Sequence, residues 1–379
     1  MRKHWIDNLR WVTVLLVLLY HVFYFYNNKG VIGGIGGFGD GPQYQDVIMY
    51  ILYPWFMPLL FILAGISARY ALQNRPAGEW FQERTRKLLV PSTIGLLFFG
   101  VVIGWINSMI SPAAEALSGL PLPIKYFIWV ISGTGPLWFI QDLWLLSLVL
   151  LLVRKLDPAN RFYDWCGRLG TVPVIFMGVL FWLGHKTLIM DPNPDSADGL
   201  WNLYKPVFYM IPFLMGYFVF SHDKVQENLS RAWGPLMICA EAACITLIFK
   251  TFGQDNTLPS YLTSPLNNIY GWLMCLAMMG WFKARFDRTG KSAGYMTRSS
   301  YGIYIVHYLI IASVGVVLKT RTSMPPACMY IILTLAVFTL SPLLYEIIRR
   351  IPFLSWCVLG MSNRPRFSGK TVEDVNKNE

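Results

Sequence analysis

The chain has 379 residues, of which 55% are hydrophobic, 16% aromatic and only 14% charged, and its formal net charge is +11. No soluble domain of this size needs so much apolar surface, so the composition excludes an ordinary soluble globular protein. The positive charge does not indicate nucleic-acid binding, because no soluble domain is available to present a basic face interleaved with aromatic residues. The six cysteines have no paired spacing, so neither a disulfide framework nor a zinc or other metal site is expected.

Ten apolar stretches are predicted to form membrane-spanning helices. They are residues 10–26, 47–68, 88–110, 136–153, 171–189, 204–221, 232–250, 267–283, 301–318 and 326–348. The first stretch follows a basic start but lacks a small-residue cleavage site, so we interpret it as a retained helix and not as a signal peptide. Residues 121–131 fit either an interfacial helix or part of the fourth span. The chain is therefore predicted to be an all-α polytopic membrane protein, with one membrane-embedded domain at 1–360 and a disordered tail at 361–379.

The distribution of basic residues predicts the orientation in the membrane. Ten spans place both termini on one side, and the segments on that side hold 25 of the 32 lysines and arginines, against 7 on the opposite side. Lysine and arginine concentrate in short cytoplasmic loops of membrane proteins. We therefore expect both termini in the cytoplasm and the protein in the cell membrane, with the lipid bilayer as its first partner.

The first predicted helix carries three ionisable residues on one face. At about 100° per residue, Asp7, Arg10 and His21 fall within roughly a quarter of the helix circumference. Arg10 and His21 are separated by about 16 Å along the axis, which is about half of a hydrocarbon core. A central charged residue costs about 2.5 to 3.5 kcal/mol on insertion scales and by default marks a function. The alternative is that Arg10 snorkels to the surface and His21 bonds to a neighbouring helix.

The second and third spans are joined by a strongly basic loop. The second span holds two prolines and a small Ala64-Gly65-Ile66-Ser67 patch, which permits a close approach of helices. Arg84, Arg86 and Lys87 follow it, at the expected cytoplasmic mouth of the third span. Three cations in this position suit the phosphates of a nucleotide-like donor. They equally suit a topology anchor that touches lipid headgroups.

Three further polar residues fall inside predicted spans. Asp142 lies at about the depth of His21 and is a candidate to orient that imidazole, or alternatively to make a structural bond. Glu241 lies at mid-depth of the seventh span, where it would line a cavity. His307 lies among Tyr301, Tyr304 and Tyr308, where it fits a hydrogen-bonded packing residue near the donor channel.

Taken together, these motifs resemble the acyltransferase 3 family of membrane O-acyltransferases, over about residues 3 to 360. The resemblance is carried by Asp7, Arg10 and His21, by 58–65, by Arg84 and Arg86 before 88–91, by 135–140 and by 300–307. It implies transfer of an acyl group, commonly acetyl or succinyl, from a cytoplasmic donor such as acetyl-CoA to a hydroxyl of a cell-surface glycan. The essential His of the family falls on His21, its first-helix Arg on Arg10, and its paired basic motif on Arg84 with either Arg86 or Lys87.

The chemistry of acyl transfer agrees with these residues. Taking a proton from a sugar hydroxyl needs a base, and a His suits that role at neutral pH. Arg10, Arg84, Arg86 and Lys87 would hold the phosphates of an acyl-CoA co-substrate, with no permanently bound cofactor, while Asp7, Glu241 and His307 would support the site. The competing hypothesis is a transporter or flippase of an anionic solute. The family motifs, and the lack of a visible internal repeat, favour the enzyme.

Overall fold

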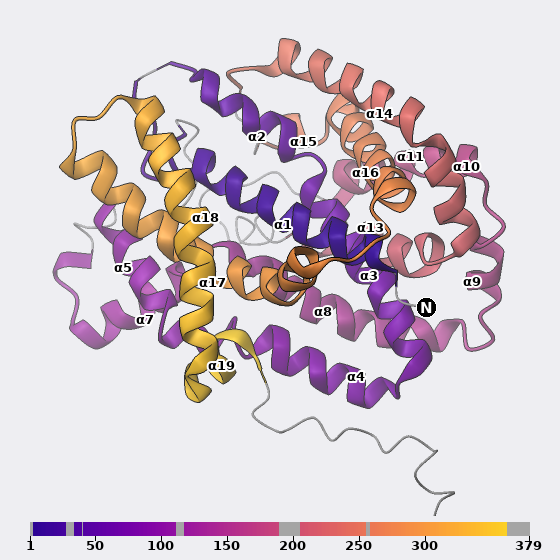
Figure 1. Ribbon diagram of the computed structural model, residues 1–379, viewed down its shortest axis with the longest axis horizontal. Coiled ribbons are helices and arrows are strands. Elements are labelled where there is room, and N and C mark those ends of the chain that lie inside the picture. The colour runs from indigo at the N-terminus through magenta and orange to yellow at the C-terminus, as the bar shows by residue number, and fades with distance from the viewer. Residues whose placement is uncertain are drawn as a thin grey trace, which may run out of the picture.

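The computed structural model describes residues 3–27, 34–39, 41–110, 117–188, 205–254 and 258–361. Within these ranges the chain forms helices and no strand (Figure 1), which confirms the all-α prediction. The predicted disordered tail lies outside the described residues except for Met361.

The chain is built from helices of very different length. In chain order they are α1 His4–Phe25, α2 Val47–Leu52, α3 Phe56–Asn74, α4 Ala77–Arg84, α5 Gly100–Ile110, α7 Leu122–Ser132, α8 Trp138–Val153, α9 Arg161–Cys166, α10 Thr171–Phe176, α11 Gly178–Leu188, α13 Pro206–Met215, α14 Asp223–Thr251, α15 Pro259–Leu262, α16 Pro265–Arg285, α17 Lys291–Arg321, α18 Pro326–Arg350 and α19 Pro352–Leu359. Short 3₁₀ or π segments extend several of them.

Seven helical segments of the described chain are long and apolar enough to cross a membrane. They are His4–Phe25, Tyr44–Asn74, Gly135–Leu156, Thr171–Leu188, Asp223–Thr251, Lys291–Arg321 and Pro326–Arg350, and three shorter apolar helices accompany them, Gly100–Ile110, Leu122–Ser132 and Pro206–Phe220. All ten predicted stretches contain helix, and the protein is a membrane protein. The number of crossings and the side of the termini stay predictions.

The third predicted span departs most from expectation. Instead of one helix over 88–110, the chain forms a π-helical segment, Thr85–Leu89, then a 3₁₀ turn, Gly95–Leu97, and only then α5. Pro91 explains the break, because a proline has no backbone N–H to donate and its ring clashes with the preceding turn of a helix. Residues 121–131, left open between an interfacial helix and a span, form most of α7, which packs along α5.

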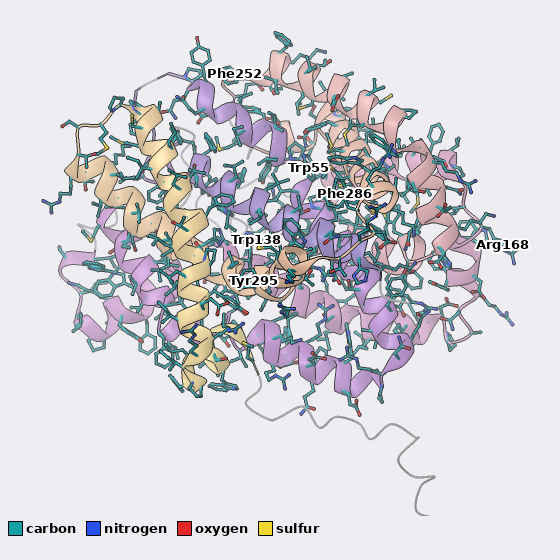
Figure 2. All side chains as sticks on the ribbon, viewed as in Figure 1. Trp55, Trp138, Arg168, Phe252, Phe286 and Tyr295 are labelled. Carbon is teal, nitrogen blue, oxygen red and sulfur yellow. The ribbon has the colours of Figure 1, made fainter. Side chains whose placement is uncertain are left out.

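Helix α1 lies in the centre of the fold, packed against α2, α3, α16, α17 and α18 (Figure 1). Close approach of α3 to α13 depends on glycine, as the small-residue patch of the second span predicts. A Cβ on Gly65 would lie 2.0 Å from the carbonyl oxygen of Phe213, and a Cβ on Gly216 would lie 2.2 Å from that of Ile62. Around these helices the interior is aromatic: Figure 2 shows Trp55 inside the bundle, whereas Arg168 projects outward at its edge.

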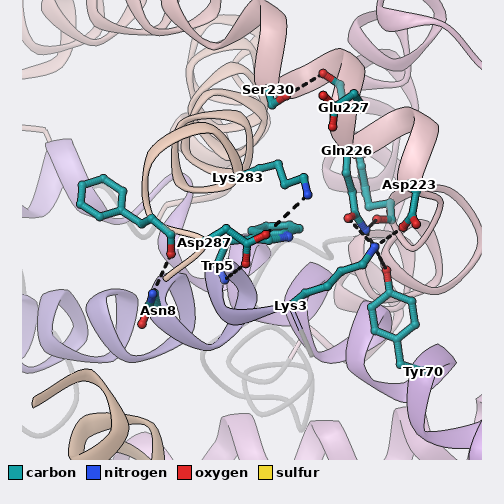
Figure 3. Close-up of polar contacts among 12 residues, drawn as sticks. Lys3, Trp5, Asn8, Tyr70, Asp223, Gln226, Glu227, Ser230, Lys283 and Asp287 are labelled. Atoms are coloured by element: carbon teal, nitrogen blue, oxygen red, sulfur yellow. Dashed lines mark hydrogen bonds and ion pairs between the residues drawn. The ribbon is translucent and has the colours of Figure 1, made fainter. Parts of the chain in front are cut away.

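The start of α1 is fixed by polar contacts to three neighbouring segments (Figure 3). The ammonium of Lys3 donates to the Tyr70 hydroxyl at 2.9 Å and to Gln226 at 2.8 Å, and it pairs with Asp223. In addition, the Trp5 amide donates to Asp287 at 3.0 Å. These contacts hold the first helix against α3, α14 and the connection between α16 and α17.

Candidate functional site

Two imidazoles meet near the C-terminal end of α1. Nε2 of His307, on α17, lies 3.3 Å from Nδ1 of His21, and the ring centroids are 5.0 Å apart. Nδ1 of His21 also lies 2.8 Å from the carbonyl oxygen of Val17, and Nδ1 of His307 lies 2.5 Å from that of Tyr304. His307 is fully buried, whereas His21 is only partly buried.

These contacts determine where the protons of the pair reside. A carbonyl oxygen only accepts hydrogen bonds, so the Nδ1 atoms of His21 and His307 must both carry hydrogen. Neutral His307 then has an unprotonated Nε2, which can accept a hydrogen bond. The single Nδ1–H of His21 is shared between this Nε2 and the carbonyl oxygen of Val17. Nε2 of neutral His21 is therefore left unprotonated, and this tautomer is the one that can take a proton from a substrate.

Tyrosines surround the exposed edge of His21. The ring centroids of Tyr20, Tyr24 and Tyr308 lie 5.3, 5.8 and 5.5 Å from that of His21. Tyr20 also stacks on Tyr53, with 5.9 Å between centroids. The imidazole of His21 is therefore packed against aromatic rings whose polar atoms are phenol hydroxyls.

Asp142 is not brought to His21. It is buried on α8 at 3% exposure, and its Oδ2 atom has no hydrogen-bond partner among the described residues. It interacts electrostatically with Tyr209 and Tyr304. The group in contact with the His21 ring is thus the imidazole of His307 and not the carboxyl of Asp142.

At the other end of α1, Arg10 faces the basic loop after α3. Its guanidinium lies 3.2 Å from the Asp7 carboxylate and donates to the Ser67 hydroxyl at 2.6 Å. Arg10 also interacts electrostatically with Arg84 on α4, another residue of the predicted donor cluster. Arg10 and His21 lie eleven residues apart on α1, or about 16 Å along its axis.

Arg84 and Arg86 form no ion pair with any carboxylate of the described chain. The Arg84 guanidinium lies 5.1 Å from the centre of the Trp80 ring, and the buried Nε atom of Arg86 has no hydrogen-bond partner. Burial, and then the neighbouring charge of Arg10, lowers the pKa of Arg84 to about 10. Neither guanidinium is thus within ion-pair distance of a described carboxylate, although Arg84 interacts electrostatically with Glu83. Guanidinium groups without a close carboxylate are suited to binding an anion.

Lys87 differs from these two arginines. Its ammonium pairs with Glu83 at 2.6 Å, and Glu83 also pairs with Arg75. Because its charge is already compensated, Lys87 is less available to a phosphate. Of the two possible partners of Arg84 in the paired basic motif, the contacts therefore favour Arg86.

Glu241 is also absent from the cluster. The structure places its side chain on the exposed face of α14, and not on a cavity wall as expected. Hydropathy predicted the helix correctly, but the face of the helix that meets its neighbours depends on packing, which the sequence pattern does not fix. An apolar groove of about 310 Å³ between α11 and α16 likewise contains none of the candidate residues.

Three contacts of the site were not predicted from the sequence. Ser67 is the hydroxyl partner of Arg10, although its sequence context indicates only a small packing residue. The direct contact of His307 with His21 joins residues 286 positions apart. Lys205, which counted only as a basic residue of a loop, is buried beside Tyr53. For Lys205, the only signal in the sequence is its position between a polar loop and an apolar stretch.

Comparison with known proteins gives one match. A family model described as an acyltransferase domain matches residues 3–346, nearly the whole chain. No curated protein and no solved structure matches.

Proposed function

The chain belongs to the acyltransferase 3 family, and we propose that it transfers an acyl group from a cytoplasmic acyl-CoA to a hydroxyl of an extracytoplasmic glycan. Acetyl and succinyl are the acyl groups proposed. The protein would lie in the cell membrane with both termini in the cytoplasm, so that the arginine cluster faces the donor and His21 lies deeper. The observation that carries the proposal is the electrostatic contact of Arg84, which forms no ion pair with a described carboxylate, with Arg10, on the helix that also holds His21.

His21 is proposed as the general base. Its unprotonated Nε2 takes the proton of the acceptor hydroxyl, and the hydroxyl oxygen attacks the thioester carbonyl. The C–O bond forms, the C–S bond breaks, and the proton passes from His21 to the departing thiolate. General-base catalysis of this kind contributes about 10² to 10⁴ in rate.

His307 is proposed as a positioning residue in this step. Its Nε2 accepts from Nδ1–H of His21 and so holds the imidazole with Nε2 toward the substrate. A second hydrogen-bond acceptor on the Nδ1 side also stabilises the imidazolium that forms when His21 gains a proton.

The donor end is proposed to be held by Arg10, Arg84 and Arg86. Acyl-CoA carries phosphates at one end and the thioester at the end of a long flexible arm. Guanidinium groups suit phosphates because their planar donors bind two oxygens at once. With the phosphates near Arg10, the arm would run along α1 and present the thioester near His21.

The direct test is label transfer in inverted membrane vesicles that contain the full-length protein and its natural glycans. Acyl-labelled acetyl-CoA or succinyl-CoA is added outside, where the cytoplasmic face is exposed. We expect label on glycan inside the vesicles, and none with the His21→Ala variant. A transporter or flippase, the competing function, would move solute and leave no acyl group on any glycan, and that result would overturn the proposal.

A further inference from the structure

The side chain of Lys205 is buried within the described part of the chain. It precedes α13, is 8% exposed, and forms no ion pair with any described residue. Its ammonium donates to the Tyr53 hydroxyl at 3.1 Å and lies 5.6 Å from the centre of that ring. Burying an ammonium group is costly unless an anion compensates it, and a phenol supplies only partial compensation.

The backbone holds Lys205 in an unusual conformation. Its φ is +49°, in the left-handed region that residues with a side chain seldom adopt. Such conformations persist where the surrounding structure enforces them, and they cluster at ligand sites. The next residue, Pro206, begins α13, so the free N–H groups of the first turn add positive potential beside the ammonium.

A continuous row of aromatic contacts links Lys205 to His21. Tyr53 stacks on Tyr20 at 5.9 Å, and Tyr20 lies edge-on to His21 at 5.3 Å. Tyr209 interacts electrostatically with both Tyr20 and Tyr53, which places these phenols in one region. Tyr20 is 3% exposed and Tyr209 7% exposed, and neither hydroxyl donates to a described group. Each of these two hydroxyls therefore has a hydrogen that it can donate to a ligand.

A second neighbour of Lys205 in the described chain is an imidazole, which carries no negative charge. His185, on α11, interacts electrostatically with Lys205. Its ring stacks on Phe208 with 3.5 Å between centroids, and its Nδ1 bonds to the Asn268 side chain. An imidazole held in this way cannot compensate an ammonium.

We propose that Lys205, together with the hydroxyls of Tyr20, Tyr53 and Tyr209, forms a subsite for an oxyanion, a carboxylate or phosphate, carried by the acceptor glycan. The subsite selects acceptors that bear an anionic substituent close to the hydroxyl that is acylated. The acceptor is the favoured source because Lys205 lies toward the His21 end of α1, whereas the donor phosphates have their own cations at the Arg10 end. This inference rests on the proposed function.

The test uses the purified full-length protein in detergent, with Lys205→Gln and, as a matched control, Lys186→Gln, which changes an exposed lysine of α11. Initial rates are measured with acetyl-CoA or succinyl-CoA, each with a neutral glucan oligosaccharide and with the same oligosaccharide bearing a glucuronate or a phosphoglycerol group. We expect Lys205→Gln to raise KM for the anionic acceptors at least about tenfold, the loss of one charge-assisted hydrogen bond. KM for the neutral acceptor with acetyl-CoA should stay unchanged, as should every value for Lys186→Gln.

Two results would overturn the inference. A loss that follows succinyl-CoA with all three acceptors would assign the subsite to the distal carboxylate of the acyl group. An equal change, or no change, in all six reactions would make Lys205 structural. Binding of the glucuronate oligosaccharide without donor, followed by intrinsic fluorescence, separates this inference from the proposed function. Binding that depends on Lys205 in a protein that transfers nothing would support the subsite and reject the transferase.

The Lys205→Arg variant keeps the charge and should still bind the glucuronate oligosaccharide. Elution in size-exclusion chromatography verifies that the Lys205→Gln variant is folded.

Discussion

Nε2 of His307 lies 3.3 Å from Nδ1 of His21, so that two residues on the first and the penultimate long helices share one hydrogen bond. Each imidazole also donates through Nδ1 to a carbonyl oxygen of its own helix. The pair therefore behaves as a unit, in which a change in one ring alters the orientation and protonation of the other.

His307→Phe should lower kcat about 10- to 100-fold and leave KM for acyl-CoA unchanged. The substitution removes the hydrogen-bond acceptor that orients His21, but it removes no contact with the acyl-CoA. His307→Gln places an amide oxygen near the same position and should recover part of the rate. Steady-state kinetics of purified protein at saturating acceptor measure both values. An equal loss of kcat in the two variants, with KM for acyl-CoA raised, would indicate that His307 only packs against its neighbours.

His21→Ala should insert and fold normally yet abolish acyl transfer, since removing a polar group from a spanning helix seldom harms insertion. His4→Ala is the matched control, because His4 lies on the same helix outside the cluster. Transfer of labelled acyl groups in vesicles is measured at equal protein levels. Normal activity in a well-inserted His21→Ala protein would remove His21 from the mechanism.

Arg84→Ala and Arg86→Ala should each raise KM for acyl-CoA more than they lower kcat, because the phosphates they hold do not change during the reaction. Lys87→Ala, which removes a cation already paired with Glu83, should have a smaller effect. Initial rates at varied acyl-CoA concentrations compare the KM values of the two arginine variants with that of Lys87→Ala. If the two arginine variants keep the wild-type KM, these residues only anchor the topology.

Arg10→Lys should keep the orientation in the membrane but lose most of the affinity for acyl-CoA. Lysine preserves the charge that orients the helix, but it lacks the planar fork that binds two phosphate oxygens and also reaches Ser67 at 2.6 Å. Titration of acyl-CoA onto protein in detergent measures the affinity, and accessibility labelling of the termini checks the orientation. An unaltered affinity would leave Arg10 as a helix anchor.

The sequence predicted the helices well, because hydropathy and length are local properties and a bilayer demands long apolar helices. The break at Pro91 was the main exception, although proline chemistry explains it. The direction of side chains was harder to predict, because lipid and protein neighbours are both apolar and the pattern does not reveal which face is buried. Glu241 was therefore expected inside and lies outside. Asp142 was considered as the partner of His21, whereas His307, expected to be a hydrogen-bonded packing residue near the donor channel, is in direct contact with it.

The central position of α1 also has a consequence for the order in which the protein is assembled. During synthesis α1 leaves the ribosome well before α17 and α18, which pack against it. The polar face of α1 must therefore persist in the membrane until α17 has been made. Folding of the site is necessarily late and depends on contacts between distant parts of the chain. A nascent chain arrested before residue 291 would hold His21 in the bilayer without the ring that orients it.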